Sequence, residues 1–597
     1  MRLPTIDLLI TSAARTARRF PFVIATAIVA AAAGYALVEN SFDPHPVAER
    51  WLAVASLGLP LLFALTLVAE RRAIGAAQAL FPFAGVAVLA VVWWYWPRWP
   101  IAQALRYAQL SAAFHLFVAF APYAVAGEQR GFWQYNKGLF LRFLTAALYT
   151  SVLYGGLAIA MAALTKLFGV PIRGEHYAQL WITLAFVFNT WFFLGGVPQD
   201  FAELETQTDY PTGLRVFTQY VLIPLVAVYV AILTVYLGKV VLTRQWPSGW
   251  IGYLVSSVAA VGMLAWLLVH PLEERAEYAW VKAYTRGFYI ALMPAIVMLW
   301  MAIWKRVDQY GITERRYLLI VLSLWLGAAA VYYTFTRSRS IKLIPATLCA
   351  IALLTFVGPW NAYAVSRRNQ LGRLQAALAH ANLIRDGKLQ RSTTSVSVED
   401  RRAITATLTY LVGSHGVASV APMLSDSLNA ALTLAHNRTR YSYAFPDVRS
   451  IMQWMHVDYT GPGGQTNGEY FAYYAQSTPQ VVAIDGYEYA VRLSAWPLRD
   501  SLQVTDGVFL HFGADSASLS VSRAGATVLT IPLRPAVDSA AARQARINAG
   551  VRTQPVRIEA ASGNLKALLS LTVVGGYRRT DGARINTLDG ELFLRLK

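Results

Sequence analysis

The strongest constraint on this chain is a succession of long apolar stretches that ends at Gly358-Pro359-Trp360. A helix needs about 20 apolar residues to cross the hydrocarbon core of a bilayer. Upstream of this tripeptide most of the sequence meets that requirement, and downstream no stretch does. The sequence therefore predicts a transmembrane helical domain over 1–360, a helical connector region over 361–440 and a soluble domain over 441–597.

The predicted fold of the first domain is a polytopic α-helical membrane bundle of about 11 transmembrane helices. Composition agrees, because 56% of residues are hydrophobic and only 14% are charged, whereas soluble domains have about 25% charged residues. The predicted spans cover residues 22–38, 51–69, 79–96, 104–125, 143–165, 177–197, 219–238, 250–270, 288–304, 317–335 and 343–359.

Charge suggests an orientation. The net charge of +19 is interpreted as positive loops facing anionic lipid, and no nucleic acid partner is expected. More Lys and Arg residues fall in the inside loops if the N-terminus is cytoplasmic, and an odd number of spans then places the C-terminal domain outside the cytoplasm. The basic loop after the ninth span argues the other way. The single cysteine, Cys349, lies in the last span, which excludes intramolecular disulfides and cysteine-based metal sites.

The connector is predicted to begin with an amphipathic helix over 361–383 that ends at the turn Asp386-Gly387. Apolar residues recur there at helical spacing, so the helix could lie on the membrane surface. The basic residues expected at the lipid headgroups are Arg367, Arg368 and Arg373. A capping box at Ser397–Asp400 predicts the start of a helix through 404–412, and a further helix is predicted over 417–434.

The C-terminal residues are predicted to form a soluble α+β domain with a mainly antiparallel sheet. Apolar residues alternate with period two in 508–512, 529–533 and 569–573, which is typical of strands. Asp485-Gly486 and Ala524-Gly525 have the sequence of hairpin turns, and 536–549 is predicted to be helical.

Polar residues inside spans are candidates for function because burying them in lipid is costly. They could line a cavity, or they could simply join helices through hydrogen bonds worth about 0.6 kcal/mol on average. No Asp or Glu falls at mid-span, which disfavours an ion-coupled transporter. The candidate cavity-lining residues are His115, Asn189, Thr190, Tyr154 and Tyr229, with further hydroxyls from Tyr149 and Tyr236.

Several loop motifs were weighed as sites and favour structural roles. Acidic runs at 200–209 and 273–277 could bind a metal or a partner, or could be solvated loops. The charged segment 310–317 could simply open the tenth span. The glycines at 461–464 lack the ending of a phosphate loop, and the pair His456 and Asp458 lacks further ligands at metal spacing. No catalytic residue, cofactor or metal site is predicted.

Several segments form a distinctive set: Phe132-Trp133-Gln134-Tyr135-Asn136, Asn189 to Pro198, Tyr210-Pro211-Thr212-Gly213-Leu214, Trp246-Pro247-Ser248-Gly249-Trp250, Tyr310 to Tyr317, Gly358-Pro359-Trp360 and Ser366 to Leu374. Together they resemble the bacterial membrane family called domain of unknown function 4153. The resemblance covers roughly 15–420 and implies a polytopic bacterial inner-membrane protein, with no established activity and no functional residues to transfer.

Three functions stay open at this point. The first is a non-enzymatic envelope protein whose bundle, surrounded by membrane lipids, anchors an extracytosolic domain that binds a ligand, a protein or an envelope polymer. The second is a transporter or lipid-translocating protein with a polar cavity in the bundle. The third is a membrane-embedded enzyme. The lack of a catalytic constellation favours the first.

Overall fold

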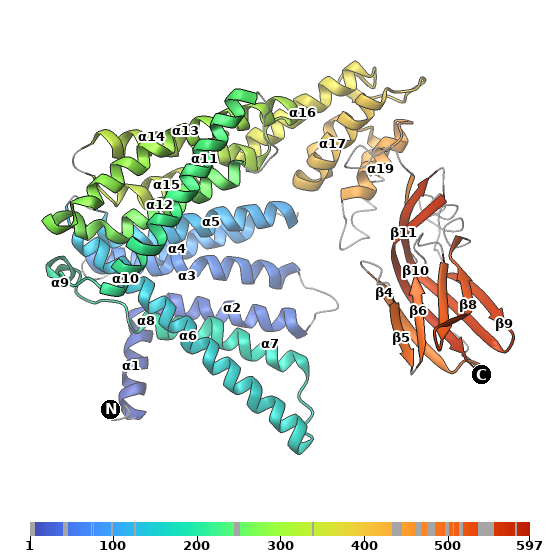
Figure 1. The fold of residues 1–597 in the computed structure, drawn as a ribbon, viewed down its shortest axis with the longest axis horizontal. Helices are drawn as coiled ribbons and strands as arrows, with labels where there is room; N and C mark the ends of the chain where they lie inside the picture. The colour runs from blue at the N-terminus through green and yellow to red at the C-terminus, as the bar shows by residue number, and fades with distance from the viewer. Residues whose placement is uncertain are drawn as a thin grey trace. The chain divides into compact units, whose positions relative to one another are not determined.

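The protein is mostly helical, with β-sheets in its C-terminal part (Figure 1). Contacts divide the chain into two compact units, Met1–Arg391 with Thr407–Ile451 and Ser392–Ala406 with Met452–Lys597. The computed structural model describes residues 6–39, 46–72, 75, 77–96, 100–124, 127–243, 251–336, 339–430, 432, 444–459, 469–474, 484–495, 501–505, 507–512, 518–534, 555–579 and 582–596.

The first unit is a succession of helices joined by short turns. The helices up to the first long span are α1 (Ile6–Arg19), α2 (Pro21–Glu39), α3 (Pro46–Arg72), α4 (Ala77–Trp94), α5 (Pro100–Phe120) and α6 (Gln129–Phe168). The middle helices are α7 (Gly174–Ile182), α8 (Asn189–Leu194), α9 (Phe201–Thr206), α10 (Thr212–Phe217) and α11 (Ile223–Thr243). Wider π-helical turns, Thr183–Phe188 and Thr218–Leu222, join α7 to α8 and α10 to α11. The remaining helices are α12 (Ile251–Val269), α13 (Ala279–Tyr310), α14 (Glu314–Phe335), α15 (Leu343–Leu354), α16 (Ala362–His380), α17 (Val398–His415) and α19 (Ala444–Trp454), the last two lying at or across the boundary with the second unit.

Among the described residues, eight helical segments are long and apolar enough to cross a bilayer. They correspond to eight of the predicted spans. Of the other three, α4 and α15 are shorter apolar helices, and α5 carries Arg106, Gln109 and His115 among its apolar residues. The eight segments are Pro21–Glu39, Val47–Arg72, Gln129–Phe168, Gly174–Leu194, Thr212–Thr243, Ile251–Glu273, Ala279–Tyr310 and Glu314–Phe335.

The apolar helices differ in how much of their surface the protein covers. In its most apolar stretch α3 is 67% buried, and it packs between α2, α4 and α5 (Figure 1). The corresponding value is 6% for α6 and 11% for the segments containing α8 and α11. Apolar side chains left uncovered in a membrane helix are expected to face lipid, because the tails are as apolar as they are. The centre of the bundle therefore includes α3, and α6, α8 and α11 lie at its periphery.

The connector largely follows the prediction. The helix α16 buries Leu374 and Leu378, and Asp386-Gly387 forms the turn between the short strands β1 (Ile384–Arg385) and β2 (Lys388–Leu389). The hydroxyl of Ser397 accepts a hydrogen bond from the amide of Asp400 at 3.1 Å, which confirms the cap of α17. The helix predicted to begin at 417 is wrong at its start: two 3₁₀ turns, Val417–Ser419 and Ala421–Met423, occupy this stretch.

The described strands of the C-terminal part form two antiparallel sheets. One contains β3 (Glu469–Tyr474), β10 (Leu565–Arg579), β11 (Gly582–Arg595) and β4 (Tyr489–Ala495) in that order, with β9 (Val556–Ser562) also paired to β10. The other has the order β5 (Ser501–Thr505), β6 (Val508–Phe512), β7 (Ser518–Arg523) and β8 (Ala526–Pro532). Leu, Ile and Val residues of both sheets share one core, so the sheets pack face to face.

The three predicted strand stretches are confirmed in β6, β8 and β10. Ala524-Gly525 forms the turn of the β7–β8 hairpin, with positive φ at both residues. Asp485-Gly486 is a turn before β4, and the residues preceding it at 475–483 lie outside the described part. The predicted helix 536–549 also lies outside the described residues, so the structure confirms the sheets, but not the helical part, of the predicted α+β domain.

Candidate functional site

A buried carboxylate opens helix α14. The chain leaves α13 at Gly311, whose φ of 71° requires glycine, and Thr313 is extended just before the new helix. Glu314 follows as the first residue of α14, where the partial positive charge of a helix N-terminus favours an acid. Its side chain is only 4% exposed, although it carries a charge. Buried charges need partners, so the surroundings of Glu314 decide what it does.

Three side chains from the two connector helices converge on this carboxylate. The hydroxyl of Ser366 in α16 donates to Oε1 at 2.8 Å. The hydroxyl of Tyr410 in α17 donates to Oε2. The Nε2 atom of His415, also in α17, lies 2.9 Å from Oε1. We call Glu314, Ser366, Tyr410 and His415 the Glu314 cluster. It joins the start of a membrane span to both connector helices.

A second polar chain continues from the connector into α5. The hydroxyl of Tyr363, one helical turn before Ser366, donates to Oε1 of Gln109 at 3.1 Å. The amide nitrogen of Gln109 donates to the hydroxyl of Thr355 at 3.0 Å and to the carbonyl of Ala352 at 2.9 Å. Gln109 is 7% exposed, and all of its hydrogen-bond partners lie in or next to α15 and α16. The polar residues of α5 are therefore used to hold the chain where the bundle meets the connector.

The chemistry of the Glu314 cluster suits holding better than bond making. Burial, and the neighbouring carboxylate of Glu314, raise the pKa of Tyr410 well above its ordinary value, so this phenol stays protonated and donates. Ser366 donates to a carboxylate that Tyr410 and His415 also contact, and among the described residues no hydrogen bond joins the serine to His415. The described geometry is that of a fixed anion that accepts from two hydroxyls and lies beside an imidazole, all three from the two connector helices.

This cluster is the feature that the sequence did not reveal. The segment 310–317 stood out by its charge, and the expectation that it opens a helix is confirmed at Glu314. Ser366 begins one of the segments that carry the family resemblance, whereas Tyr410 and His415 carried no signal. For Glu314 the only signal was the charge density of the segment 310–317.

The predicted cavity residues lie on four different helical elements. Asn189 opens α8 directly after a π-helical turn, is half-buried together with Thr190, and accepts a hydrogen bond from the buried Thr150 of α6 at 3.3 Å. The ring of Tyr154 packs edge-on against Trp181 with centroids 5.1 Å apart. Asn189 and Tyr154 thus both lie along the contact between α6 and the α7–α8 segment.

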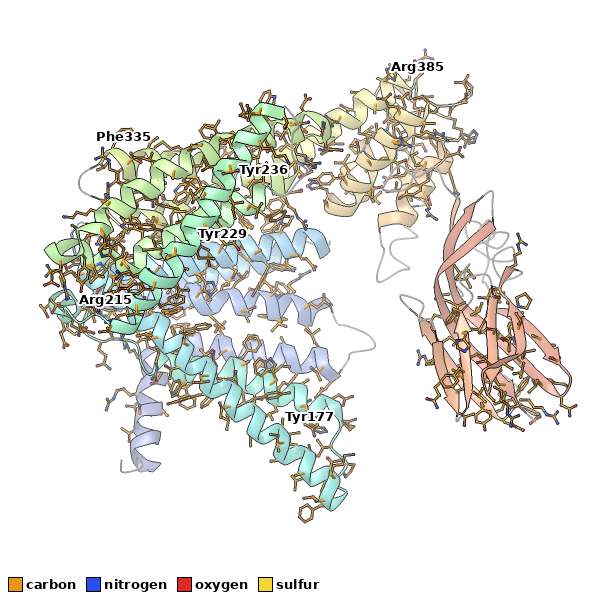
Figure 2. All side chains as sticks on the ribbon, in the orientation of Figure 1. Tyr177, Arg215, Tyr229, Tyr236, Phe335 and Arg385 are labelled. Carbon is orange, nitrogen blue, oxygen red and sulfur yellow. The ribbon has the colours of Figure 1, made fainter. Side chains whose placement is uncertain are left out.

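The other predicted cavity residues lie elsewhere. His115 is exposed on α5, and its Nδ1 atom lies 2.8 Å from the carbonyl oxygen of Ser111 in the same helix. Tyr229 is 45% exposed on α11, on the same helix as the half-buried Tyr236 (Figure 2). Neither His115 nor Tyr229 makes a hydrogen bond or ring contact with Asn189 or Tyr154 in the described structure. Their role in lining a cavity stays a prediction.

The basic residues of α16 are exposed, and two of them bind backbone of this chain. Arg373 donates to the carbonyl oxygens of Asp308 at 3.4 Å and Gln309 at 2.8 Å, at the end of α13. Arg368 donates to the carbonyls of Pro359 and Ala364. Arg367 is exposed. The predicted contact of all three with lipid headgroups stays a prediction.

Two of the motifs that carry the family resemblance, 132–136 and 210–214, meet at the start of α6. Trp133 is 7% exposed, stacks on Tyr210 with ring centroids 5.4 Å apart, and donates from its indole to the carbonyl of Leu267 at 2.8 Å. Gln134 donates to the carbonyls of Gln207 and Asp209, both at 3.1 Å. These contacts fix the segment 207–210 on the first turns of α6.

The acidic run before this segment has structural partners. Asp200 caps α9 by accepting from the amides of Ala202 and Glu203, and Glu205 accepts from the amide of Gly131 at 2.6 Å. Asp209 pairs with Lys137 at 2.8 Å, and this hydrogen bond lowers the pKa of the carboxyl below its ordinary value. In the described part of the chain, no group of three or more His, Cys, Asp or Glu residues is placed to hold a metal ion. Asp458, of the pair weighed as a metal site, bonds to Arg401 at 2.9 Å.

A cavity of about 230 Å³ lies between α12, α14 and α15. Its walls are almost entirely apolar and include Met263, Leu267, Trp325 and Leu348. Cavities lined in this way suit apolar matter, since a water molecule needs two to four polar partners. This cavity therefore lacks the polar groups that the transport hypothesis requires.

Comparison with known proteins finds relatives for the membrane part. The family model described as "Domain of unknown function (DUF4153)" matches residues 24–390. An uncharacterized protein of Pasteurella multocida (strain Pm70) is 21% identical over 419 residues, which is 68% of this chain and 70% of that protein. No solved structure matches the chain. The matched residues include Glu314 and Ser366 and end before Tyr410 and His415.

Proposed function

The chain belongs to the family named domain of unknown function 4153, and from that premise we propose that it is a non-enzymatic envelope protein whose membrane bundle anchors an extracytosolic, partner-binding domain. The partner is a protein or polymer of the cell envelope, and membrane lipids surround the bundle. Among the described residues, eight apolar helices of spanning length support the anchoring role. A sandwich of two sheets supports the partner-binding role.

We propose that the bundle lies in the inner membrane of a bacterium and crosses it about 11 times. The N-terminus is then in the cytoplasm and the C-terminal domain in the periplasm. The three crossings beyond the eight apolar spans are α4, α5 and α15. The helix α5 packs against both α3 and α15, and its polar residues Gln109 and Arg106 contact protein groups. Polar side chains are tolerated within a bundle when they find such partners.

The observation that carries the proposal is the Glu314 cluster. A transmembrane helix that begins with a buried carboxylate, bonded to Ser366 of α16 and Tyr410 of α17, is rigidly tied to the connector. Breaking such a buried pair by removing one partner costs about 3–5 kcal/mol. An anchor needs this kind of joint, because a flexible linker would not hold a partner-binding domain at a fixed position relative to the membrane.

The test combines topology with partner capture in the intact protein. A C-terminal alkaline phosphatase fusion should be active, and a C-terminal fluorescent fusion that folds only in the cytoplasm should be dark. A photo-crosslinking residue at Phe509, which is 36% exposed on β6, should capture an envelope protein or polymer. The matched control at Tyr253, which is 71% exposed on α12, should capture lipid only. An inactive phosphatase fusion together with a bright fluorescent fusion would overturn the assigned side of the domain.

A second candidate, transport or lipid translocation, is favoured by one observation. Asn189 follows a π-helical turn, a rare irregularity that recurs at functional sites, and contacts Thr150 across the α6–α8 interface. If Asn189 lines a path, Asn189→Leu should abolish the cellular phenotype and leave abundance unchanged. If Asn189 only joins helices, the same variant should lower abundance or thermal stability and keep activity per molecule. The control Thr150→Val removes the same hydrogen bond and should then have the same effects.

A further inference from the structure

The turn between α13 and α14 concentrates arginine at one point of the surface. Arg316 donates to the carbonyl oxygens of Tyr310 at 3.2 Å and Gly311 at 2.8 Å. Arg373 reaches the same turn from α16 through the carbonyls of Asp308 and Gln309. We call Arg306, Arg316 and Arg373 the arginine cluster. Its members come from α13, α14 and α16 and lie around the three-residue turn 311–313.

The guanidinium group of Arg316 is repelled by the charges of both Arg306 and Arg373. Arg306 and Arg316 also share the ring of Tyr310, with their guanidinium carbons 5.8 Å and 5.4 Å from its centroid. Like charges at such spacing raise the local potential and attract a counter-ion. The fold therefore maintains a concentrated positive charge on this surface.

In the described part of the chain, no ion pair joins a carboxylate to Arg306, Arg316 or Arg373. Glu314, the nearest buried acid, is taken by Ser366, Tyr410 and His415. The hydrogen bonds from Arg316 and Arg373 go to backbone carbonyls, which carry no net charge. Each of these two guanidinium groups uses two of its five N–H donors in this way, so three donors per group are left for another acceptor. Guanidinium groups match phosphate oxygens in geometry as well as charge.

The position of the cluster indicates which phosphate it meets. Helix α13 has 32 residues, or about 48 Å at 1.5 Å per residue, so its end extends beyond a hydrocarbon core of about 30 Å. Around this end Trp304, Tyr310 and Trp360 are 77%, 53% and 54% exposed. Exposed Trp and Tyr beside basic residues are typical of the headgroup layer of a membrane. We propose that the arginine cluster is a binding site for the phosphate group of an anionic membrane lipid.

The site is separate from the anchoring role of the Glu314 cluster and is tested on the full-length protein in detergent. Native mass spectrometry measures retention of phosphatidylglycerol and of phosphatidylcholine. The wild-type protein should retain phosphatidylglycerol preferentially. Arg306→Gln/Arg373→Gln should weaken this binding about 30-fold, since each basic residue near an anionic surface contributes about fivefold. The control Arg173→Gln/Arg385→Gln removes the same charge at two exposed positions outside the cluster and should bind like wild type.

Two further measurements separate binding from folding. Arg306 makes none of the hydrogen bonds to the turn, so Arg306→Gln alone should weaken phosphatidylglycerol about fivefold and leave thermal unfolding unchanged. Excess inorganic phosphate should not displace the lipid, because its acyl chains add apolar contacts. Equal retention of the two lipids, equal losses in the cluster and control variants, or displacement by free phosphate would each overturn the assignment.

Discussion

Replacing Glu314 by alanine should loosen the joint between the membrane bundle and its connector. The substitution removes the acceptor of the Ser366 hydroxyl at 2.8 Å, of the Tyr410 hydroxyl, and the partner of His415 at 2.9 Å. A buried donor left without an acceptor costs about 1–3 kcal/mol. The simple sum of three such penalties overestimates the loss of stability, because the vacated space lets some of these groups turn to each other or admit water. We therefore expect a loss of about 3–5 kcal/mol, the range for a broken buried pair.

Glu314→Gln separates the charge from the shape. The amide keeps one oxygen acceptor in place, so the loss should fall to about 1–2 kcal/mol, or one to two hydrogen bonds. The desolvation cost of the carboxylate is removed at the same time, which offsets part of the lost attraction. The control Glu175→Ala removes a carboxylate that is 39% exposed and 3.2 Å from Arg173. Exposed pairs of this kind contribute at most about 1 kcal/mol.

Hydrogen exchange and thermal unfolding of the full-length protein in detergent give the two readouts. In Glu314→Ala, amides of α16 and α17 should exchange faster by a factor on the order of 10²–10⁴, because a local opening becomes easier by the same free energy. Amides of α3 should be unchanged. The order of unfolding temperatures should be wild type and Glu175→Ala, then Glu314→Gln, then Glu314→Ala. Indistinguishable exchange in Glu314→Ala and Glu175→Ala would refute the view that this carboxylate holds the connector.

Three further perturbations test other contacts. Gly311→Ala should strongly lower stability to thermal unfolding, because a Cβ there meets Arg373 at 2.5 Å. The control Gly387→Ala, at φ 75°, has open space around the new Cβ and should show only backbone strain of about 1–2 kcal/mol. Trp133→Ala should cost about 3–5 kcal/mol by emptying a buried ring site, measured in the same assay. The pKa of Asp209 is lowered by its partner Lys137, so the pair stabilises the protein above the ordinary pKa and this stabilisation disappears as pH falls through the lowered value. A Lys137→Met variant should lose that acidic dependence.

Much of the fold follows from the sequence because the solvent dictates it. A helix that crosses hydrocarbon must be apolar along its whole length, so α2, α3 and α14 stand out by hydropathy alone. Alternating residues predicted β6 and β8, since a strand with one buried face allows no other pattern. The helix expected from 417 is wrong at its start for a local reason: Gly416 adopts φ 77° and Pro422 lacks an amide N–H, so 3₁₀ turns precede the helical residues 426–430.

The candidate site was far less predictable. Glu314 and Ser366 are 52 residues apart, and Glu314 and Tyr410 are 96 apart. Hydropathy and periodicity describe each helix by itself, and they contain no information on which faces of two distant helices meet. Mid-span residues such as Asn189 and His115 attracted attention because polarity in lipid is rare. A buried polar cluster instead gathers at Glu314, the first residue of a span.

The arginine-rich turn also bears on the orientation of the bundle. Counting Lys and Arg by loop placed this turn outside and so weakened the inference that the N-terminus is cytoplasmic. The counting rule assumes that loop charge acts chiefly during insertion. Here Arg316 binds the carbonyls of Tyr310 and Gly311, and Arg373 binds those of Asp308 and Gln309, so both contact the end of α13. Arginines that contact the folded turn would be placed there on either side of the membrane, so they carry little information about orientation. When they are left out of the Lys and Arg count, the bias toward a cytoplasmic N-terminus increases.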